Sequence, residues 1–112
     1  MIIDYPYPGI FKKVHEEIAN EFMRLNPDIE VKFGSPAADY EQANQRILLN
    51  AVTGRLPDVS FQALNRLRPL IDRGVVTSLN TLAKGDQEWD SLQIEHGLLK
   101  ATTFDGEIYG IP

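Results

Sequence analysis

The first 25 residues contain a short apolar run followed by a long amphipathic stretch. Ile2 and Ile3 form the apolar run, which predicts a short strand that the loop sequence DYPYPG then ends. From Ile10 to Leu25 apolar residues recur at spacings of three and four, which predicts a helix with one buried face. The residues predicted for that face are Phe11, Val14, Ile18, Phe22 and Leu25.

A second strand and helix follow. Between Ile29 and Phe33 apolar and polar residues alternate, which predicts a half-buried strand at the edge of a sheet. Asp39 and Gln42 have the spacing of a capping box, so a helix is expected to begin just behind Asp39 and to end at Gly54. Its predicted buried residues are Tyr40, Ala43, Ile47, Leu48, Ala51 and Val52.

The remaining pattern predicts one more strand, two helices and a hairpin. LPDVSF at residues 56–61 is a strand, and a short helix from Asn65 to Arg73 follows it, with Gly74 as its C-cap. The residues predicted to point inward near this helix are Leu64, Leu67, Leu70 and Ile71. Residues 75–80 are predicted to be extended and residues 84–90 to form a polar loop. A helix of about Asp90 to Lys100 then leads into a β-hairpin at residues 102–109, with Asp105 and Gly106 as its turn.

Strands that alternate with helices predict an α/β fold with a parallel sheet. We expect a partial parallel sheet in the order 2-1-3, flanked by helices on both faces, with the C-terminal β-hairpin beside it. The first strand is placed in the centre because it is short and apolar, whereas residues 29–33 alternate as an edge strand does. In such a sheet ligands bind at the carboxyl ends of the strands.

Composition narrows the possible partners. The chain has 112 residues, 43% of them hydrophobic and 24% charged, which fits one globular domain or part of one. The net charge is −5 and no run of basic residues exceeds two, which argues against nucleic acid and anionic membranes as partners. Cysteine is absent, so disulfides and thiolate chemistry are excluded. No apolar run approaches the roughly 20 residues of a membrane span. The N-terminus carries no secretory leader, so the protein is expected to be cytosolic or to have lost a leader.

Catalytic motifs are missing. The sequence contains no phosphate-binding loop and none of the GxGxxG, HExxH or GxSxG motifs. His15 is predicted at a surface or boundary position, and His96 near the end of the last helix, where a cation suits the helix dipole. Nothing suggests that the two histidines meet in a metal site, and Asp58 is expected to be a turn or cap residue. We therefore expect no enzyme, no catalytic residue, no metal and no cofactor.

Aromatic residues in loops give the better functional signal. Tyr5 and Tyr7 follow the first strand in a loop framed by prolines, and tyrosine can both stack on a sugar and donate a hydrogen bond. Gln62 follows the third strand and offers two donors and one acceptor. The predicted ligand-binding rim consists of Tyr7, Asp39 and Gln62, with Tyr5 and Tyr40 as further candidates. For Tyr5 the alternative is packing against the sheet.

Four segments carry a resemblance to a known family. They read IFKKVHEEIANEFMRLNPDIEVKF, DYEQANQRILLNAVTGRLPDVSFQAL, LIDRGVVTSLN and FDGEIYGIP. Together they resemble the extracellular solute-binding proteins of ABC importers, in the branch that takes up sugars and oligosaccharides. Ser78 and Asn80 depart from the family pattern, which usually has Pro and Asp at these positions.

The resemblance implies a fold, a function and a location. It implies a periplasmic-binding-protein-like lobe that binds a small solute, with a carbohydrate as the expected ligand, and delivers it to the membrane permease of an ABC transporter. It also implies a periplasmic or extracellular location, with membrane association in Gram-positive bacteria.

Family members are much longer and have two lobes, so the resemblance also implies that residues 1–112 are a truncated fragment. The fragment would be part of the N-terminal lobe, without the second lobe. Such a fragment is expected to self-associate through uncovered apolar surface. Two alternatives stay open: a small cytosolic α/β enzyme or flavodoxin-like domain, and an interaction module whose hairpin edge pairs with a partner strand.

Overall fold

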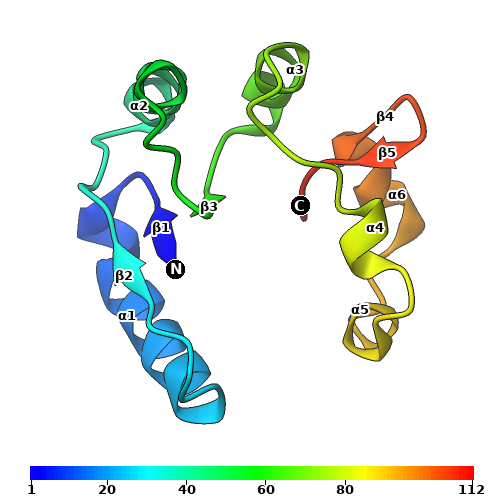
Figure 1. The fold of residues 1–112 in the computed structure, drawn as a ribbon, viewed down its shortest axis with the longest axis horizontal. Coiled ribbons are helices and arrows are strands. Elements are labelled where there is room, and N and C mark those ends of the chain that lie inside the picture. The colour runs from blue at the N-terminus through cyan, green and yellow to red at the C-terminus, as the bar shows by residue number, and fades with distance from the viewer. The chain divides into compact units, whose positions relative to one another are not determined.

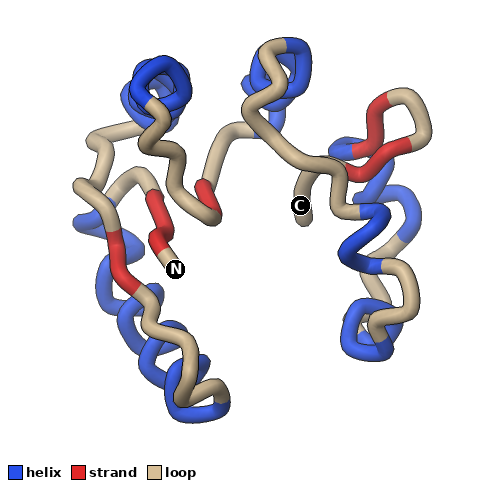
Figure 2. The backbone as a smooth tube through the Cα atoms, in the orientation of Figure 1, coloured by secondary structure: helices blue, strands red, loops and turns tan.

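The computed structural model describes residues 1–112 as two compact units, residues 1–63 and 64–112 (Figure 1). The first unit contains β1 (Ile2–Asp4), α1 (Pro8–Leu25), β2 (Lys32–Phe33), α2 (Tyr40–Thr53) and β3 (Val59–Ser60). The second contains η1 (Leu64–Arg66), α3 (Leu67–Asp72), α4 (Asn80–Ala83), α5 (Gln87–Ser91), α6 (His96–Leu99), η2 (Lys100–Thr102), β4 (Thr103–Phe104) and β5 (Glu107–Ile108). Strands are short beside the helices and loops (Figure 2). None of the helices combines the length and the apolar character that a membrane crossing requires.

The sheet of the first unit confirms the predicted topology. Its three strands are parallel and lie in the order β2-β1-β3, and Ile3 is paired with both Phe33 and Val59. β2 lies at an edge as predicted, but only residues 32–33 of the predicted strand join the ladder. The amide of Val31 points instead at the sulfur of Met23, 3.4 Å away, which takes it out of the ladder.

Helix α1 confirms the predicted element, but the predicted buried face is largely wrong. His15 packs on the face of the sheet that carries Tyr5 and Phe33, with ring centroids 4.3 Å and 6.2 Å from theirs. Ala19 is the one fully buried residue of the helix. The other apolar side of the helix is uncovered within the first unit. Its residues, with exposed fractions of 50–69%, are Ile10, Val14, Ile18 and Leu25, here called the α1 stripe.

Helix α2 begins and ends as predicted. Asp39 is its N-cap and accepts a hydrogen bond of 2.8 Å from the amide of Gln42, while Gly54 ends the helix at a φ of +69°. Ala43 and Ile47 are buried as predicted, and Leu48 and Ala51 are half-buried. The predictions for Tyr40 and Val52 are wrong, since 37% and 85% of these residues are exposed. They lie in the first and last turns of the helix.

The second unit corrects the predicted last helix. Instead of one helix over residues 90–100, α5 ends at Ser91 and α6 begins at His96, with Gln93 between them at a φ of +49°. Part of the predicted polar loop is helical, because the Asp86 carboxylate caps α5 by accepting from the amide of Glu88 at 2.8 Å. His96 begins a helix rather than lying near the end of one, so the predicted dipole interaction is wrong.

The C-terminal hairpin forms as predicted. Asp105 and Gly106 have φ values of +53° and +80°, the backbone conformation that this two-residue turn needs. Leu67 and Leu70 are buried as predicted, whereas Leu64 is half exposed, contrary to the prediction. Asn80 fastens α4 to the hairpin: its amide nitrogen donates to the Gly106 carbonyl at 3.1 Å, and its amide oxygen accepts from Ile108 at 2.9 Å.

We expect Asn80→Asp to lower the free energy of unfolding of the second unit by about 1 kcal/mol. An aspartate carboxylate can still accept from Ile108 but cannot donate to Gly106, and it places a charge against that carbonyl. Urea unfolding measures the effect, and Thr81→Ala, an exposed change in the same helix, is the control. Equal stability of wild type and Asn80→Asp would show that the bond to Gly106 contributes nothing.

Candidate functional site

A cavity of about 130 Å³ lies in the first unit, beyond the carboxyl ends of β1 and β3. Tyr5 and Pro6 reach it from the end of β1, and Phe61 from the end of β3. Helix α1 contributes Phe11 and His15, and Tyr40 comes from the first turn of α2. These six residues are here called the aromatic site.

Three rings of the aromatic site, together with Phe33 of β2, pack around the imidazole of His15. Its centroid lies 4.3 Å from that of Tyr5, 4.8 Å from that of Phe61 and 5.9 Å from that of Phe11, the last with the two rings nearly parallel. The fourth neighbour is Phe33, which lies deeper in the sheet. The wall of the cavity is therefore aromatic, with a nitrogen heterocycle at its centre.

Tyr7 extends the aromatic surface at its rim. Its ring meets that of Tyr40 edge to face at a centroid distance of 5.4 Å. Tyr7 is the N-cap of α1 with φ and ψ both near +57°, a left-handed conformation that costs a non-glycine residue on the order of 1–3 kcal/mol. The bond of 3.0 Å from the Tyr7 amide to the Ala37 carbonyl holds it there, together with the bonds that the Tyr7 carbonyl accepts from the amides of Ile10 and Phe11. The rim is thus fixed before any ligand arrives.

The five predicted site residues lie at the same end of the sheet. Tyr5 and Tyr40 line the cavity and Tyr7 contacts Tyr40, so the structure brings these three together. Tyr5 is only 5% exposed and packs against the sheet, which was its predicted alternative. A role of these residues in binding stays a prediction.

Asp39 and Gln62 stand beside the aromatic site rather than in its wall. Asp39 precedes Tyr40 and uses one carboxylate oxygen to cap α2. Gln62 follows Phe61, and its amide nitrogen donates to the hydroxyl of Ser60 at 2.7 Å. Its amide oxygen is buried without a partner, and Gln62 is not among the residues that line the cavity.

The sequence did not point to Phe11, His15 and Phe61 as site residues. Phe11 was assigned to the helix core, and His15 to a surface or boundary position, which its half-buried place agrees with. A signal was present: Phe11 and His15 are one helical turn apart and therefore share a face. Phe61 stands one residue after Ser60, the partner of Asp4, just as Tyr5 stands one residue after Asp4.

Burial keeps the aromatic site uncharged at neutral pH. It lowers the pKa of His15, which favours neutral imidazole, and it raises the pKa of Tyr5, with a further contribution from the charge of Glu16. On the other side of β1, burial raises the pKa of Asp4 more than the charge of Arg46 lowers it. No group of three or more histidine or acidic residues is placed to hold a metal ion. The arrangement suits a neutral ligand.

We expect the first unit to lose stability as the pH falls below about 6.5. The unfolded chain binds a proton at His15 more readily than the folded chain does, so protons favour unfolding between 6.5 and the lower folded pKa. Asp4 has the opposite effect on stability. Its pKa is raised in the folded chain, so protonation of Asp4 stabilises the fold in the more acidic range just above its ordinary pKa of 3.8.

Thermal unfolding measured between neutral pH and about pH 5 tests this expectation. His15→Phe keeps an aromatic ring and should flatten the decline. His96→Gln, an exposed change in the second unit, is the control and should leave it in place. A decline of equal size in His15→Phe would assign the pH dependence to other groups.

Comparisons with known proteins show the family and the fold of the chain. A family model described as "Bacterial extracellular solute-binding protein" matches residues 17–112. A search of curated protein sequences found no match.

Similar solved structures include UgpB from Mycobacterium tuberculosis in complex with glycerophosphocholine, with a TM-score of 0.83 and 23% identity over 100% of this chain and 29% of that one. The sugar-binding protein MalE from Xanthomonas citri has a TM-score of 0.82 and 20% identity over 100% of this chain and 28% of its own. Lmo0181 from Listeria monocytogenes in complex with cycloalternan has a TM-score of 0.80 and 23% identity over 97% and 27%. The chain therefore shares their fold and spans between a quarter and a third of their length.

Proposed function

The chain belongs to the bacterial extracellular solute-binding proteins, and on that premise we propose that it is part of a protein that binds a small carbohydrate and delivers it unchanged to an ABC-type permease. The observation that carries the proposal is the aromatic site, with Tyr7 and Tyr40 at its rim. Family membership gives the protein a periplasmic or extracellular location. The alternative of a cytosolic enzyme is not favoured, because the family is one of solute binding and transport.

The chemistry of the site fits a sugar. Aromatic rings stack on the apolar C–H face of a pyranose, and the tyrosine hydroxyls can bond to its oxygens. The second carboxylate oxygen of Asp39, next to Tyr40 in the chain, is a further acceptor. None of the six lining residues is Lys or Arg, so a phosphate-bearing ligand such as the glycerophosphocholine of UgpB fits less well.

We further propose that residues 1–112 form part of the N-terminal lobe of a two-lobed protein. The fraction of the solved relatives that the chain spans supports this, as does the apolar stripe left uncovered on α1. In the longer protein a second lobe would cover the ligand from the side opposite the aromatic site. Membrane association in Gram-positive bacteria rests on the family resemblance alone.

The test of the proposal is saturation-transfer NMR of the chain with mono- and oligosaccharides, since this method detects weak binding through the ligand protons. We expect transfer to sugar C–H protons, weakened about 5- to 10-fold in Tyr40→Ala through loss of the ring. Tyr40→Phe keeps the ring and should lose less. Gln45→Ala, an exposed change on the same helix, is the matched control.

Two results would contradict the proposal. One is the absence of transfer to every saccharide tested. The other is an equal signal from Tyr40→Ala and wild type, which would place any bound sugar elsewhere on the chain.

A further inference from the structure

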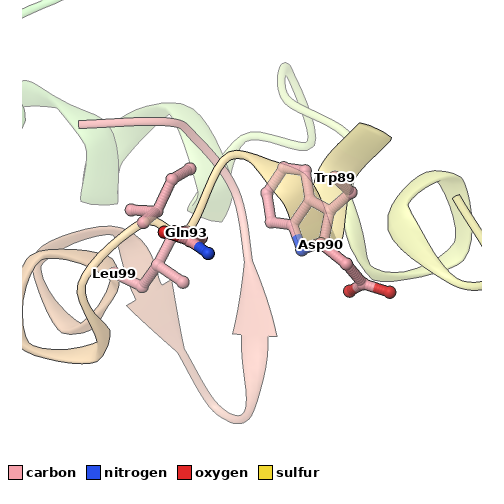
Figure 3. Close-up of a pocket in the computed structure, with 5 residues that line it drawn as sticks. Trp89, Asp90, Gln93 and Leu99 are labelled. Carbon is pink, nitrogen blue, oxygen red and sulfur yellow. The ribbon is translucent and has the colours of Figure 1, made fainter. Parts of the chain in front are cut away.

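The second unit contains a cavity of its own, of about 160 Å³. It is lined by Trp89 and Asp90 from α5, by Gln93 and Ile94 from the break between the helices, and by Leu99 from α6. In Figure 3 the indole of Trp89 stands on one side of the gap, and Gln93 and Leu99 stand on the other. Trp89 is half-buried and lines the cavity.

The cavity lies at the break between α5 and α6, where the sequence pattern predicted a continuous helix. Residues 90–100 read as one helix, yet the chain leaves the helix after Ser91 and places Gln93 at a φ of +49°. A non-glycine residue in this conformation costs on the order of 1–3 kcal/mol, and such strain gathers at functional sites. The break spreads α5 and α6 apart and aims a polar side chain into the gap between them (Figure 3).

The polar groups around the indole have no partners in the chain. The capping hydrogen bond of Asp86 reaches the backbone amide of Trp89, which fixes the start of α5 and hence the tryptophan. The side chains of Trp89, Asp90 and Gln93 make no hydrogen bond or ion pair of their own. The Gln93 amide, which is both donor and acceptor, therefore stands across the cavity from the indole, while the Asp90 carboxylate lies on the other side of the indole (Figure 3).

We propose that this cavity binds a single pyranose ring, as a sugar subsite separate from the aromatic site. The indole stacks on the apolar face of the ring and the Gln93 amide bonds to its hydroxyl groups, while the Asp90 carboxylate places a negative charge close to the cavity. The volume is about half of the roughly 300 Å³ of small typical ligand sites, so the cavity holds one ring and not a chain. The carboxylate disfavours acidic sugars. The ligand class rests on the proposed function, whereas the location does not.

Trp89 is the one tryptophan of the chain and reports on its own cavity. Indole fluorescence of the whole chain, titrated with glucose and with glucuronate, is the first measurement. We expect a saturable change in emission with glucose in the millimolar range and at least about 5-fold weaker binding of glucuronate, because of the Asp90 charge. Asp90→Asn should remove that difference.

Two substitutions at one position separate binding from folding. Gln93→Gly accepts the positive φ without strain but lacks the amide, and we expect it to weaken glucose binding about 5-fold. Gln93→Asn tolerates the same backbone, keeps an amide, and should bind within about 2-fold of wild type. Circular dichroism checks that both variants are folded.

The outcomes distinguish this inference from the proposed function. A fluorescence change that persists in Tyr40→Ala supports a separate subsite. Sugar binding detected by NMR with no change in Trp89 emission overturns the subsite and leaves the proposed function standing. A change that rises linearly with sugar concentration, or equal affinity in Gln93→Gly and wild type, also overturns it.

Discussion

The 112-residue chain on its own is expected to bind saccharides with a dissociation constant in the millimolar range, about 4 kcal/mol weaker than a micromolar complex. The aromatic site offers about 130 Å³, below the roughly 300 Å³ of small typical ligand sites, and Tyr40 at its rim is 37% exposed. A sugar there stays half solvated, so its hydrogen bonds largely replace bonds to water and contribute little. The cost of ordering the ligand remains.

Calorimetry with mono- and oligosaccharides measures this dissociation constant. A linear polyol such as sorbitol is the control, since it offers hydroxyl groups but no ring to stack on tyrosine. A low-micromolar dissociation constant from a monomer would show that these 112 residues are a complete binding unit. It would contradict the proposal that a second lobe is needed.

Self-association is the second large effect that we expect, and the α1 stripe is the surface that drives it. Val14, Ile18 and Leu25 are 50–64% exposed on one side of a helix, an apolar surface that a monomer rarely leaves open. Ile18→Lys places a charge in the middle of the stripe and should shift the chain to monomer at concentrations where wild type associates.

Sedimentation velocity over a range of protein concentrations tests this expectation. Asn20→Lys adds the same charge to an exposed position of the same helix outside the stripe, so it should still associate as wild type does. A monomeric wild type at the highest concentration, or equal association of both variants, would show that the stripe does not drive contact between copies.

Local patterns were enough to predict most of the fold. Alternation at residues 29–33 predicted the edge strand, and the Asp39 to Gln42 spacing and Gly54 predicted the bounds of α2. The Asp-Gly pair predicted the hairpin turn. Each of these features depends on neighbours within a few positions, which is why periodicity and turn chemistry were enough.

What could not be predicted depends on contacts between distant residues. The side of α1 that is covered carries His15, which packs on Tyr5, and the buried Ala19, although Val14 and Ile18 on the exposed side are more hydrophobic. The break at Gln93 could not be predicted from the sequence, because residues 91–96 contain no glycine or proline. The tyrosines of the candidate site were predictable because they stand in loops after strands, whereas His15 and Phe61 join them only through packing and register.

The place of β1 in the sheet has a consequence for the rate of folding. β1 is the first element to be synthesised, yet it lies between two strands that come later, and its contact with the segment before β3 joins residues 56 positions apart. Loop closure over that distance must precede the stabilisation that pairing brings, so parallel pairing of this kind is slow compared with helix formation. Helices α1 and α2 can therefore form early, while β1 keeps an open edge until Val59 and Ser60 arrive. We expect the docking of β3 to limit the rate at which the first unit folds, and β1, the strand made first, to be completed last.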